Sequence, residues 1–274
     1  MKKFNSALYT KIIRMNHVKL FAVISVLILL SIPSASATEP VMITISSTMD
    51  KINFDGKWTF YTEWKQSSLN TISYADGTQI QLRTAHQDNF IYVLIDETSK
   101  TKFNKYGDMA VICFDKNDTR SVTADENDYC FGVPFEGKHP FTLRGGSPLA
   151  ETSHYIKIQN PDGLIGVSGV SDQNDRYTTT PHASYEFRIP TDLVGRSDIY
   201  GFYLGVYDQR TNHVYSWPQD ASASSLLDIP PPKNWGEIIS PDKTLPEFPL
   251  PGLAFLLSII PLIVFRRGLL GNSA

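Results

Sequence analysis

The chain has 274 residues, of which 42% are hydrophobic and 19% are charged, and its formal net charge is −3. This composition excludes collagen-like, coiled-coil and disordered chains, and the length suits one domain of about 200 residues with further segments at its ends. The first 37 residues carry five basic groups and no acidic one, which leaves 20 basic against 28 acidic residues in the remainder. A body with that acidic excess is not expected to bind nucleic acid, because phosphate contacts need a basic face.

The N-terminal segment 1–37 has the order of a secretory signal peptide. Basic residues in 1–19 precede a 13-residue apolar run at 20–32, and Ala35-Ser36-Ala37 has the small-x-small form of a signal-peptidase site. We expect a signal helix that is cleaved before Thr38. An uncleaved membrane anchor is the alternative, although the run is short for a span of about 20 residues.

Short strands are predicted throughout the middle of the chain. Alternating or continuous apolar patterns mark strands at 41–45, 79–84, 90–95, 109–114, 184–189 and 200–207, with weaker candidates at 129–133, 154–158, 164–167 and 213–217. Turn pairs such as Asp76-Gly77 and Gly145-Gly146 separate them. Many short strands at this spacing predict an all-β domain at 38–220, an antiparallel β-sandwich of jelly-roll-like form.

The C-terminal part is predicted to be a linker followed by a membrane segment. Residues 221–245 are rich in Ser and Pro, which is typical of a stalk or linker. The uncharged stretch 248–265 has 18 residues and is followed by Arg266 and Arg267. As a helix it measures about 27 Å, close to the hydrocarbon thickness of a bilayer. The paired arginines indicate a cytoplasmic end, so 246–274 is predicted to hold a transmembrane helix with the body outside.

Pro246, Glu247 and Phe248, followed by the apolar stretch and the paired arginines, resemble the PEF-type C-terminal sorting signals of archaeal surface proteins. The resemblance implies that an archaeosortase-type enzyme cuts near the motif and transfers the protein to a surface anchor. Retention as a plain transmembrane anchor is the alternative. Either way, we expect an extracellular protein held at the cell-surface membrane.

The segment Ile52-Asn53-Phe54-Asp55-Gly56-Lys57-Trp58, with Glu63-Trp64 after it, is similar to the "I-D-G-x-W…E-W" opening of family-9-like carbohydrate-binding domains. Segments 89–96, 108–115, 185–190 and 201–217 resemble later strands of that family, in the same order. The resemblance implies a β-sandwich that binds glycan or polysaccharide without catalysis. The family also includes heme-binding subunits of dehydrogenases and surface domains without a known ligand, so the fold does not settle the function.

Sugar recognition needs flat aromatic faces for the pyranose C–H groups and polar side chains for the hydroxyls. Candidates for such a platform are Trp58, Trp64 and Trp217, with Tyr207 or Tyr203 nearby. Packing in the core is the alternative for each tryptophan. Trp235 lies past the predicted domain, near the linker.

The most acidic loop lies between the two cysteines. Asp115, Asn117, Asp118, Asp125 and Asp128 offer the oxygen ligands that Ca²⁺ prefers, although their spacing is not that of an EF-hand. A solvated acidic loop is the alternative. Since some members of the resembled family carry structural Ca²⁺, Asp55 and Asp96 are alternative ligands by position.

Cys113 and Cys130 are the two cysteines of the chain, and in an oxidising compartment they are expected to form a disulfide across this loop. Asn117-Asp118-Thr119 is a candidate acceptor of an N-linked glycan. The histidines after residue 37 are scattered along the sequence, which does not predict a zinc site.

No catalytic motif of a serine hydrolase, zinc protease or nucleotide-binding loop is present in the sequence, so we expect no enzymatic activity. Heme binding would need an axial ligand such as Met109, Met42 or Met49, and is the weakest alternative. The sequence therefore predicts a surface-anchored carbohydrate-binding protein. A structural or adhesion domain with no sugar ligand is the rival prediction.

Overall fold

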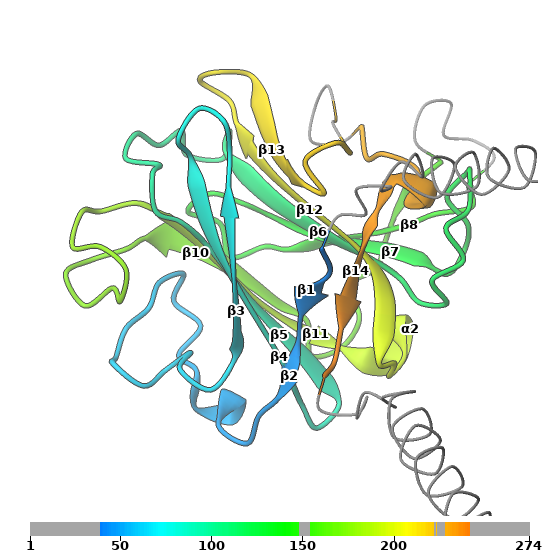
Figure 1. Ribbon diagram of the computed structural model, residues 1–274, viewed down its shortest axis with the longest axis horizontal. Coiled ribbons are helices and arrows are strands. Elements are labelled where there is room, and N and C mark those ends of the chain that lie inside the picture. The colour runs from blue at the N-terminus through cyan, green and yellow to red at the C-terminus, as the bar shows by residue number, and fades with distance from the viewer. Residues whose placement is uncertain (1–38, 148–153, 222, 224–227, 242–274) are drawn as a thin grey trace, which may run out of the picture. The chain divides into compact units, whose positions relative to one another are not determined.

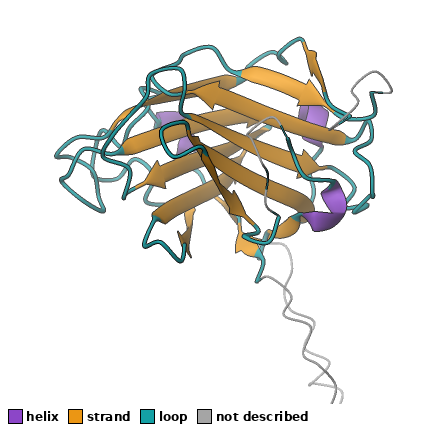
Figure 2. Ribbon diagram, turned by 90° about the horizontal axis from the view of Figure 1, so that it is seen from above, coloured by secondary structure: helices purple, strands orange, loops and turns teal. Residues whose placement is uncertain are grey.

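The computed structural model describes residues 39–147, 154–221, 223 and 228–241. These residues form two β-sheets that pack face to face (Figure 1). Helix in this part of the chain is limited to the short segments α2 (Thr191–Val194), η1 (Met49–Lys51) and η2 (Pro232–Asn234), and strands dominate the view in Figure 2. The all-β fold class predicted from the sequence is confirmed.

The larger sheet has eight strands among the described residues, and the smaller sheet has six. The larger sheet runs in the order β1 (Val41–Met42), β14 (Gly236–Ile239), β12 (Ile199–Asp208), β6 (Met109–Asp115), β7 (Asp128–Pro134), β8 (Phe141–Arg144) and β9 (Ile156–Ile158), and β13 (His213–Trp217) also pairs with β12. The smaller sheet runs in the order β10 (Ile165–Val170), β11 (Ala183–Pro190), β5 (Phe90–Glu97), β4 (Gln79–Gln87) and β2 (Thr44–Ile45), and β3 (Ser68–Ser73) also pairs with β4.

Both sheets are mixed, which corrects the expectation of a purely antiparallel sandwich. β1 pairs in parallel with β14, and β2 pairs in parallel with β4. The chain changes sheets at Ile43, between β1 and β2, where the Ile43 N–H donates to the carbonyl of Ile239 at 2.9 Å. The alternation of residues 41–45 predicts an extended backbone but not the strand with which it pairs. No hairpin turn connects these residues to their partner strands, so the sequence does not fix whether the pairing is parallel or antiparallel.

The main core lies between the sheets and follows the two-residue period of the strands. Phe202, Leu204 and Val206 of β12 are buried there with Ile112 and Phe114 of β6. The facing sheet contributes the buried side chains Leu82, Val93, Ile95, Tyr185 and Phe187. Burial of these apolar side chains is the main contribution to the stability of the sandwich.

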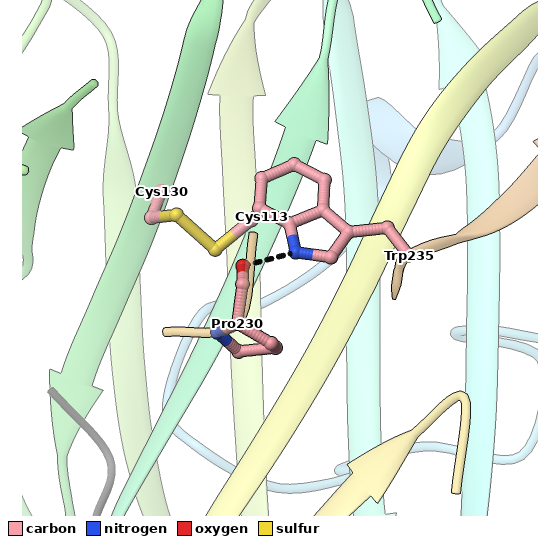
Figure 3. Close-up of a disulfide and its surroundings, with 4 residues drawn as sticks. All are labelled: Cys113, Cys130, Pro230 and Trp235. Carbon is pink, nitrogen blue, oxygen red and sulfur yellow. Dashed lines mark hydrogen bonds between the residues drawn. A yellow bond between two sulfur atoms is a disulfide. The ribbon is translucent and has the colours of Figure 1, made fainter. Parts of the chain in front are cut away.

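A second cluster covers the other face of the larger sheet. Cys113 and Cys130 stand opposite each other on β6 and β7 and form a disulfide, with their Cα atoms 4.0 Å apart. This confirms the predicted disulfide. Trp235 is buried in the same cluster, and its indole N–H donates to the carbonyl of Pro230 at 2.8 Å (Figure 3).

Part of the predicted linker at 221–245 belongs to the sandwich. β14 pairs with β12 and lies beside β1 in Figure 1, and Ile229 and Trp235 are buried. The N–H of Ser240 also donates to the carbonyl of Asp198 at 2.8 Å. The domain therefore extends to Ser240 and not to 220. The prolines are typical of a linker, but the residues after them supply the N–H groups that a sheet edge needs.

Among the described residues, no helix is long and apolar enough to cross a membrane. The predicted signal peptide at 1–37 and transmembrane helix at 248–265 lie outside the described residues, as do Pro246, Glu247 and Phe248 of the sorting motif.

Candidate functional site

Trp58 and Trp64, the first two residues of the predicted sugar platform, pack against the outer face of the smaller sheet. Both are buried, with exposed fractions of 1% and 0%. The Trp64 indole N–H donates to the Glu186 carboxylate at 3.0 Å, and that of Trp58 donates to the carbonyl of Phe60 at 2.6 Å. Neither ring has a face open to a sugar, so the structure corrects the expected platform at these positions. The rings instead hold segment 46–67 on the sheet.

The other platform residues lie elsewhere. Trp217 is buried between the sheets, where its ring centroid is 5.9 Å from that of Phe202. Tyr207 is half-buried against the cluster around the disulfide, and its hydroxyl donates to Asn212 at 2.9 Å. Tyr203 is buried in that cluster. The structure therefore does not bring the predicted platform residues together.

The Glu186 carboxylate on β11 fastens segment 53–67 to the smaller sheet. Its Oε2 accepts the backbone N–H groups of Asp55 at 3.1 Å and Gly56 at 2.7 Å, and its Oε1 accepts the Trp64 indole N–H. Burial raises the pKa of Glu186, whereas the three N–H donors favour its anion. Gly56 has a φ of +87°, and a Cβ there would stand 2.3 Å from the carbonyl carbon of Ser168. Only glycine permits this approach.

A second buried carboxylate closes the turn. Glu63 Oε1 accepts the N–H of Asn53 at 2.8 Å, and Oε2 accepts the N–H of Thr59 at 2.6 Å. Burial raises the pKa of Glu63. The first half of segment 53–67 is thus tied to its second half by one side chain.

Arg83 of β4 connects this segment to the loop 171–182 between β10 and β11. Its Nη1 donates to the carbonyls of Trp64 and Ser67, both at 3.1 Å, and its Nε donates to the Tyr177 hydroxyl at 2.5 Å. The guanidinium also lies 5.2 Å from the centre of the Trp58 ring. Because Arg83 is buried, these contacts hold both loops in one arrangement.

Two aromatic side chains on this framework are open to solvent. Phe60 is 38% exposed and Tyr61 is 67% exposed. The Lys65 ammonium is 4.8 Å from the centre of the Tyr61 ring, and the Arg176 guanidinium is 5.5 Å from it. A hydrogen bond from Arg176 and the charge of Lys65 lower the pKa of Tyr61. We call Phe60, Tyr61, Lys65 and Arg176 the aromatic surface.

The aromatic surface was not predicted from the sequence, because its exposed rings are a phenylalanine and a tyrosine, whereas the predicted platform was built on tryptophans. The available signal was the adjacent pair Phe60-Tyr61, placed in a turn between Trp58 and Trp64. Arg176 is more than a hundred positions away and has no sequence signal of its own.

In the acidic loop between β6 and β7, carboxylates accept hydrogen bonds from backbone N–H groups of the same loop. Asp115 and Asp128 are buried opposite each other at the ends of the strands. Asp115 accepts the N–H groups of Asn117 and Arg120, at 3.1 and 3.0 Å, and Asp128 accepts that of Asp125 at 2.7 Å. The predicted Ca²⁺ site here stays a prediction.

Asp118 of the same loop forms an ion pair with Arg120 at 3.3 Å. The side chain of Asn117 is exposed, as an acceptor of a glycan requires. The predicted glycosylation also stays a prediction.

Asp96, Asp175 and His182 are all buried, and one ligand-type atom from each lies within 4.8 Å of the others. Asp55, the other alternative ligand, is not part of this group, and its Oδ2 accepts the Thr59 hydroxyl at 2.7 Å. Among the described residues, Asp96, Asp175 and His182 are the group whose side-chain atoms come close enough together to hold a metal ion.

A groove of about 560 Å³ lies beside the turn between β4 and β5. It is lined by Ile45, Ser46, Ser47, His86, Gln87, Asp88, Asn89 and Arg196. The lining contains no Trp, Tyr or Phe, so it lacks the ring face that carbohydrate stacking uses.

No protein-family model matches this chain, and no curated protein matches it. Among solved structures, the chain is similar to a carbohydrate binding module of family 9 from Caldicellulosiruptor kristjanssonii in complex with glucose, with a TM-score of 0.45. It is also similar to the module from that organism in complex with cellotriose, with a TM-score of 0.46. In both cases the identity is 14%, and the match covers 77% of this chain and all of the other.

Proposed function

We propose that this chain is a non-catalytic carbohydrate-binding protein and that the aromatic surface is its binding site. The observation that carries the proposal is the Tyr61 ring, which is 67% exposed and flanked by the cations of Lys65 and Arg176. The two cations lie over this ring, and the part of the ring that they leave open can contact pyranose C–H groups while the cations donate to hydroxyls, which are the two needs of sugar recognition.

The support of the aromatic surface is preorganised. Segment 53–67 is held by the Glu186 and Glu63 carboxylates, and loop 171–182 is held to it by Arg83. A surface fixed in this way loses little conformational entropy on binding, so more of the contact energy contributes to affinity.

The charges around Tyr61 favour a glycan with anionic groups. Lys65 and Arg176 are both exposed, whereas the nearby Lys57 is paired with Asp172 at 2.5 Å. A guanidinium donates two parallel hydrogen bonds to a carboxylate, and an ammonium adds a point charge. We therefore expect uronate-containing polysaccharides to bind more tightly than neutral ones, with an affinity that falls as salt concentration rises.

The proposal of binding without catalysis rests on the composition of the surface. Most glycoside hydrolases use a pair of carboxyl groups on the two sides of the bond that is cleaved. Phe60, Tyr61, Lys65 and Arg176 supply no carboxylate. They suit a site that holds a sugar and leaves it unchanged.

A glycan array with neutral and uronate-containing polysaccharides tests this function. The wild-type chain should bind members of the acidic set, and Tyr61→Ala and Arg176→Ala should lose most of that signal. Tyr106→Ala is the matched control, because Tyr106 is 62% exposed beside Lys105, on the loop between β5 and β6. Absence of binding to every glycan would favour a structural or adhesion domain, and equal binding by all variants would remove the aromatic surface from the site.

We also propose that the protein is exported and anchored at the cell surface. The signal-like segment 1–37 and the sorting-like segment 246–267 support this proposal, and so does the buried disulfide, which suits an oxidising compartment. Mass spectrometry of the membrane fraction should find a chain that begins at Thr38. A C-terminus near Glu247 would indicate processing at the sorting motif, an intact C-terminus would indicate a plain anchor, and recovery of the uncleaved chain from the cytosol would contradict export.

A further inference from the structure

We propose that Asp96, Asp175 and His182 form a binding site for a divalent transition-metal ion of the Zn²⁺ class. Asp96 lies at the end of β5, and the other two residues lie on loop 171–182. His182 Nε2 is 2.6 Å from Asp96 Oδ1 and 3.8 Å from Asp175 Oδ2. An ion held by three such atoms would join the loop to the sheet.

The Nδ1 contacts of His182 direct its other nitrogen, Nε2, toward the two carboxylates, where it lies 2.6 Å from Asp96 Oδ1. Its Nδ1 is 2.8 Å from the carbonyl oxygen of Thr180 and 2.8 Å from the Ser171 hydroxyl. A carbonyl oxygen only accepts, so Nδ1 carries a proton, and a neutral ring would have its lone pair on Nε2. Metal-binding histidines are commonly fixed in this way, with the second nitrogen donating to a backbone carbonyl.

Each of the two carboxylates has one buried oxygen without a hydrogen bond. Asp175 Oδ1 accepts the N–H groups of Tyr177 at 2.7 Å and Thr178 at 3.0 Å, which leaves Oδ2 for the cluster. Asp175 Oδ2 and Asp96 Oδ2 are buried and form no hydrogen bond. Burying carboxylate oxygens without partners is costly, and a divalent cation between them removes that cost.

The alternative is a protonated His182 that bridges two carboxylates without an ion. The distance of 3.8 Å from Nε2 to Asp175 Oδ2 is too long for a hydrogen bond, so this arrangement leaves Asp175 Oδ2 without a partner. A tetrahedral ion with ligands at about 2.05 Å places them about 3.3 Å apart, between the two observed separations. The imidazole nitrogen favours Zn²⁺ over Ca²⁺, which takes oxygen ligands.

Such an ion would order the loop that supplies Arg176 and Tyr177. Arg176 is part of the aromatic surface, and Tyr177 accepts the hydrogen bond from Arg83. The metal site stands on its own geometry, and only this consequence for sugar binding rests on the proposed function. Loss of metal would weaken sugar binding, whereas loss of the Tyr61 ring would leave metal content unchanged.

Equilibrium dialysis of the EDTA-stripped full chain against ZnCl₂ or CaCl₂, with metal content measured by mass spectrometry, tests the site. We expect one Zn²⁺ per chain, an unfolding midpoint that Zn²⁺ raises, and visible d–d bands when Co²⁺ replaces it. Asp175→Asn keeps an oxygen for the two backbone N–H groups and should lower zinc affinity at least tenfold. His182→Ala should abolish the Co²⁺ bands, and the exposed His139 gives the control His139→Ala, which should behave as wild type.

Three results would overturn the metal site. The first is a wild-type chain that retains no Zn²⁺ and shows no shift in unfolding, which would leave a buried ion pair without a metal. The second is equal zinc retention by wild type and Asp175→Asn, which would place the ion elsewhere. The third is Ca²⁺ retention equal to that of Zn²⁺ and lost in Asp175→Asn, which would contradict a ligand set built on an imidazole. If His182→Ala does not fold, Asp175→Asn still decides between these outcomes.

Discussion

The backbone N–H of Gly56 donates to the Glu186 carboxylate at 2.7 Å, across 130 positions of the sequence. The same carboxylate accepts the indole N–H of Trp64. One buried side chain of β11 therefore positions segment 53–67, which carries the exposed Tyr61. This relationship explains why a D-G-x-W…E-W pattern can build a surface whose tryptophans are hidden and whose neighbouring ring is exposed.

Replacing Gly56 tests how closely this segment approaches the sheet. Gly56 and Gly77 have nearly equal φ values, +87° and +88°, but a Cβ at Gly56 meets Ser168 at 2.3 Å, and a Cβ at Gly77 meets nothing within 4 Å. Both alanine variants incur the cost of a positive φ, and Gly56→Ala should lose about 1–3 kcal/mol more because of the steric overlap. Urea unfolding measures the difference. Equal losses of unfolding free energy in the two variants would show that the close contact between Gly56 and Ser168 does not affect stability.

Removing the disulfide should destabilise the larger sheet. Cys113 and Cys130 are 17 positions apart, and closing a loop of this size stabilises by about 3 kcal/mol in the chain-entropy model. The double variant Cys113→Ala/Cys130→Ala should therefore unfold at a lower urea concentration than wild type, with a steeper dependence on urea because its unfolded chain is no longer cross-linked. A wild-type chain whose unfolding midpoint does not move on reduction would be inconsistent with this contribution.

The buried pair Lys100–Asp208 should make stability fall at acid pH. Burial opposes the charge of Asp208, but the ion pair with Lys100, at 2.7 Å, and the N–H groups of Thr211 and Arg210 outweigh it and hold the pKa of Asp208 below its ordinary value of 3.8. The unfolded chain then binds this proton more readily than the folded chain does. The stabilisation is present above the unfolded pKa and is lost as the pH falls through the lower folded value.

Asp208→Asn tests this pH dependence. The asparagine keeps an oxygen for the N–H groups of Arg210 and Thr211, at 2.8 and 3.3 Å, but cannot be an anion. The variant should be less stable than wild type at neutral pH, and the gap should narrow as the pH falls below about 4. Unfolding midpoints across the acid range measure the gap. A constant gap at every pH would mean that the charge of Asp208 adds nothing to stability.

The sequence predicts those parts of the fold in which the local pattern matches the environment. The alternation Phe202, Leu204, Val206 matches a strand with one face in the core, and β5 and β6 are continuous apolar runs because they lie at the centre of their sheets. Strand β3 was missed because the sequence Ser68–Ser73 is mostly polar and half-exposed. Strand β14 was missed because it follows three prolines.

The sites were harder to predict, because they depend on contacts between distant segments. A tryptophan in a turn is equally suited to a sugar platform and to a core. Trp58 and Trp64 are core residues because segment 46–67 packs back onto the smaller sheet, which the local sequence does not predict. His182 and Asp96 are 86 positions apart and meet because Ser184 pairs with Asp96 across β11 and β5. Scattered histidines in the sequence therefore did not exclude a histidine in a ligand cluster.

Titration calorimetry of the best-bound polysaccharide against wild type, Tyr61→Ala and Tyr106→Ala tests the central claim most directly. The account predicts that Tyr61→Ala weakens binding at least tenfold, about 1.4 kcal/mol, while Tyr106→Ala binds as wild type does. Undiminished binding by Tyr61→Ala, with thermal unfolding equal to that of wild type, would contradict a carbohydrate site on the aromatic surface.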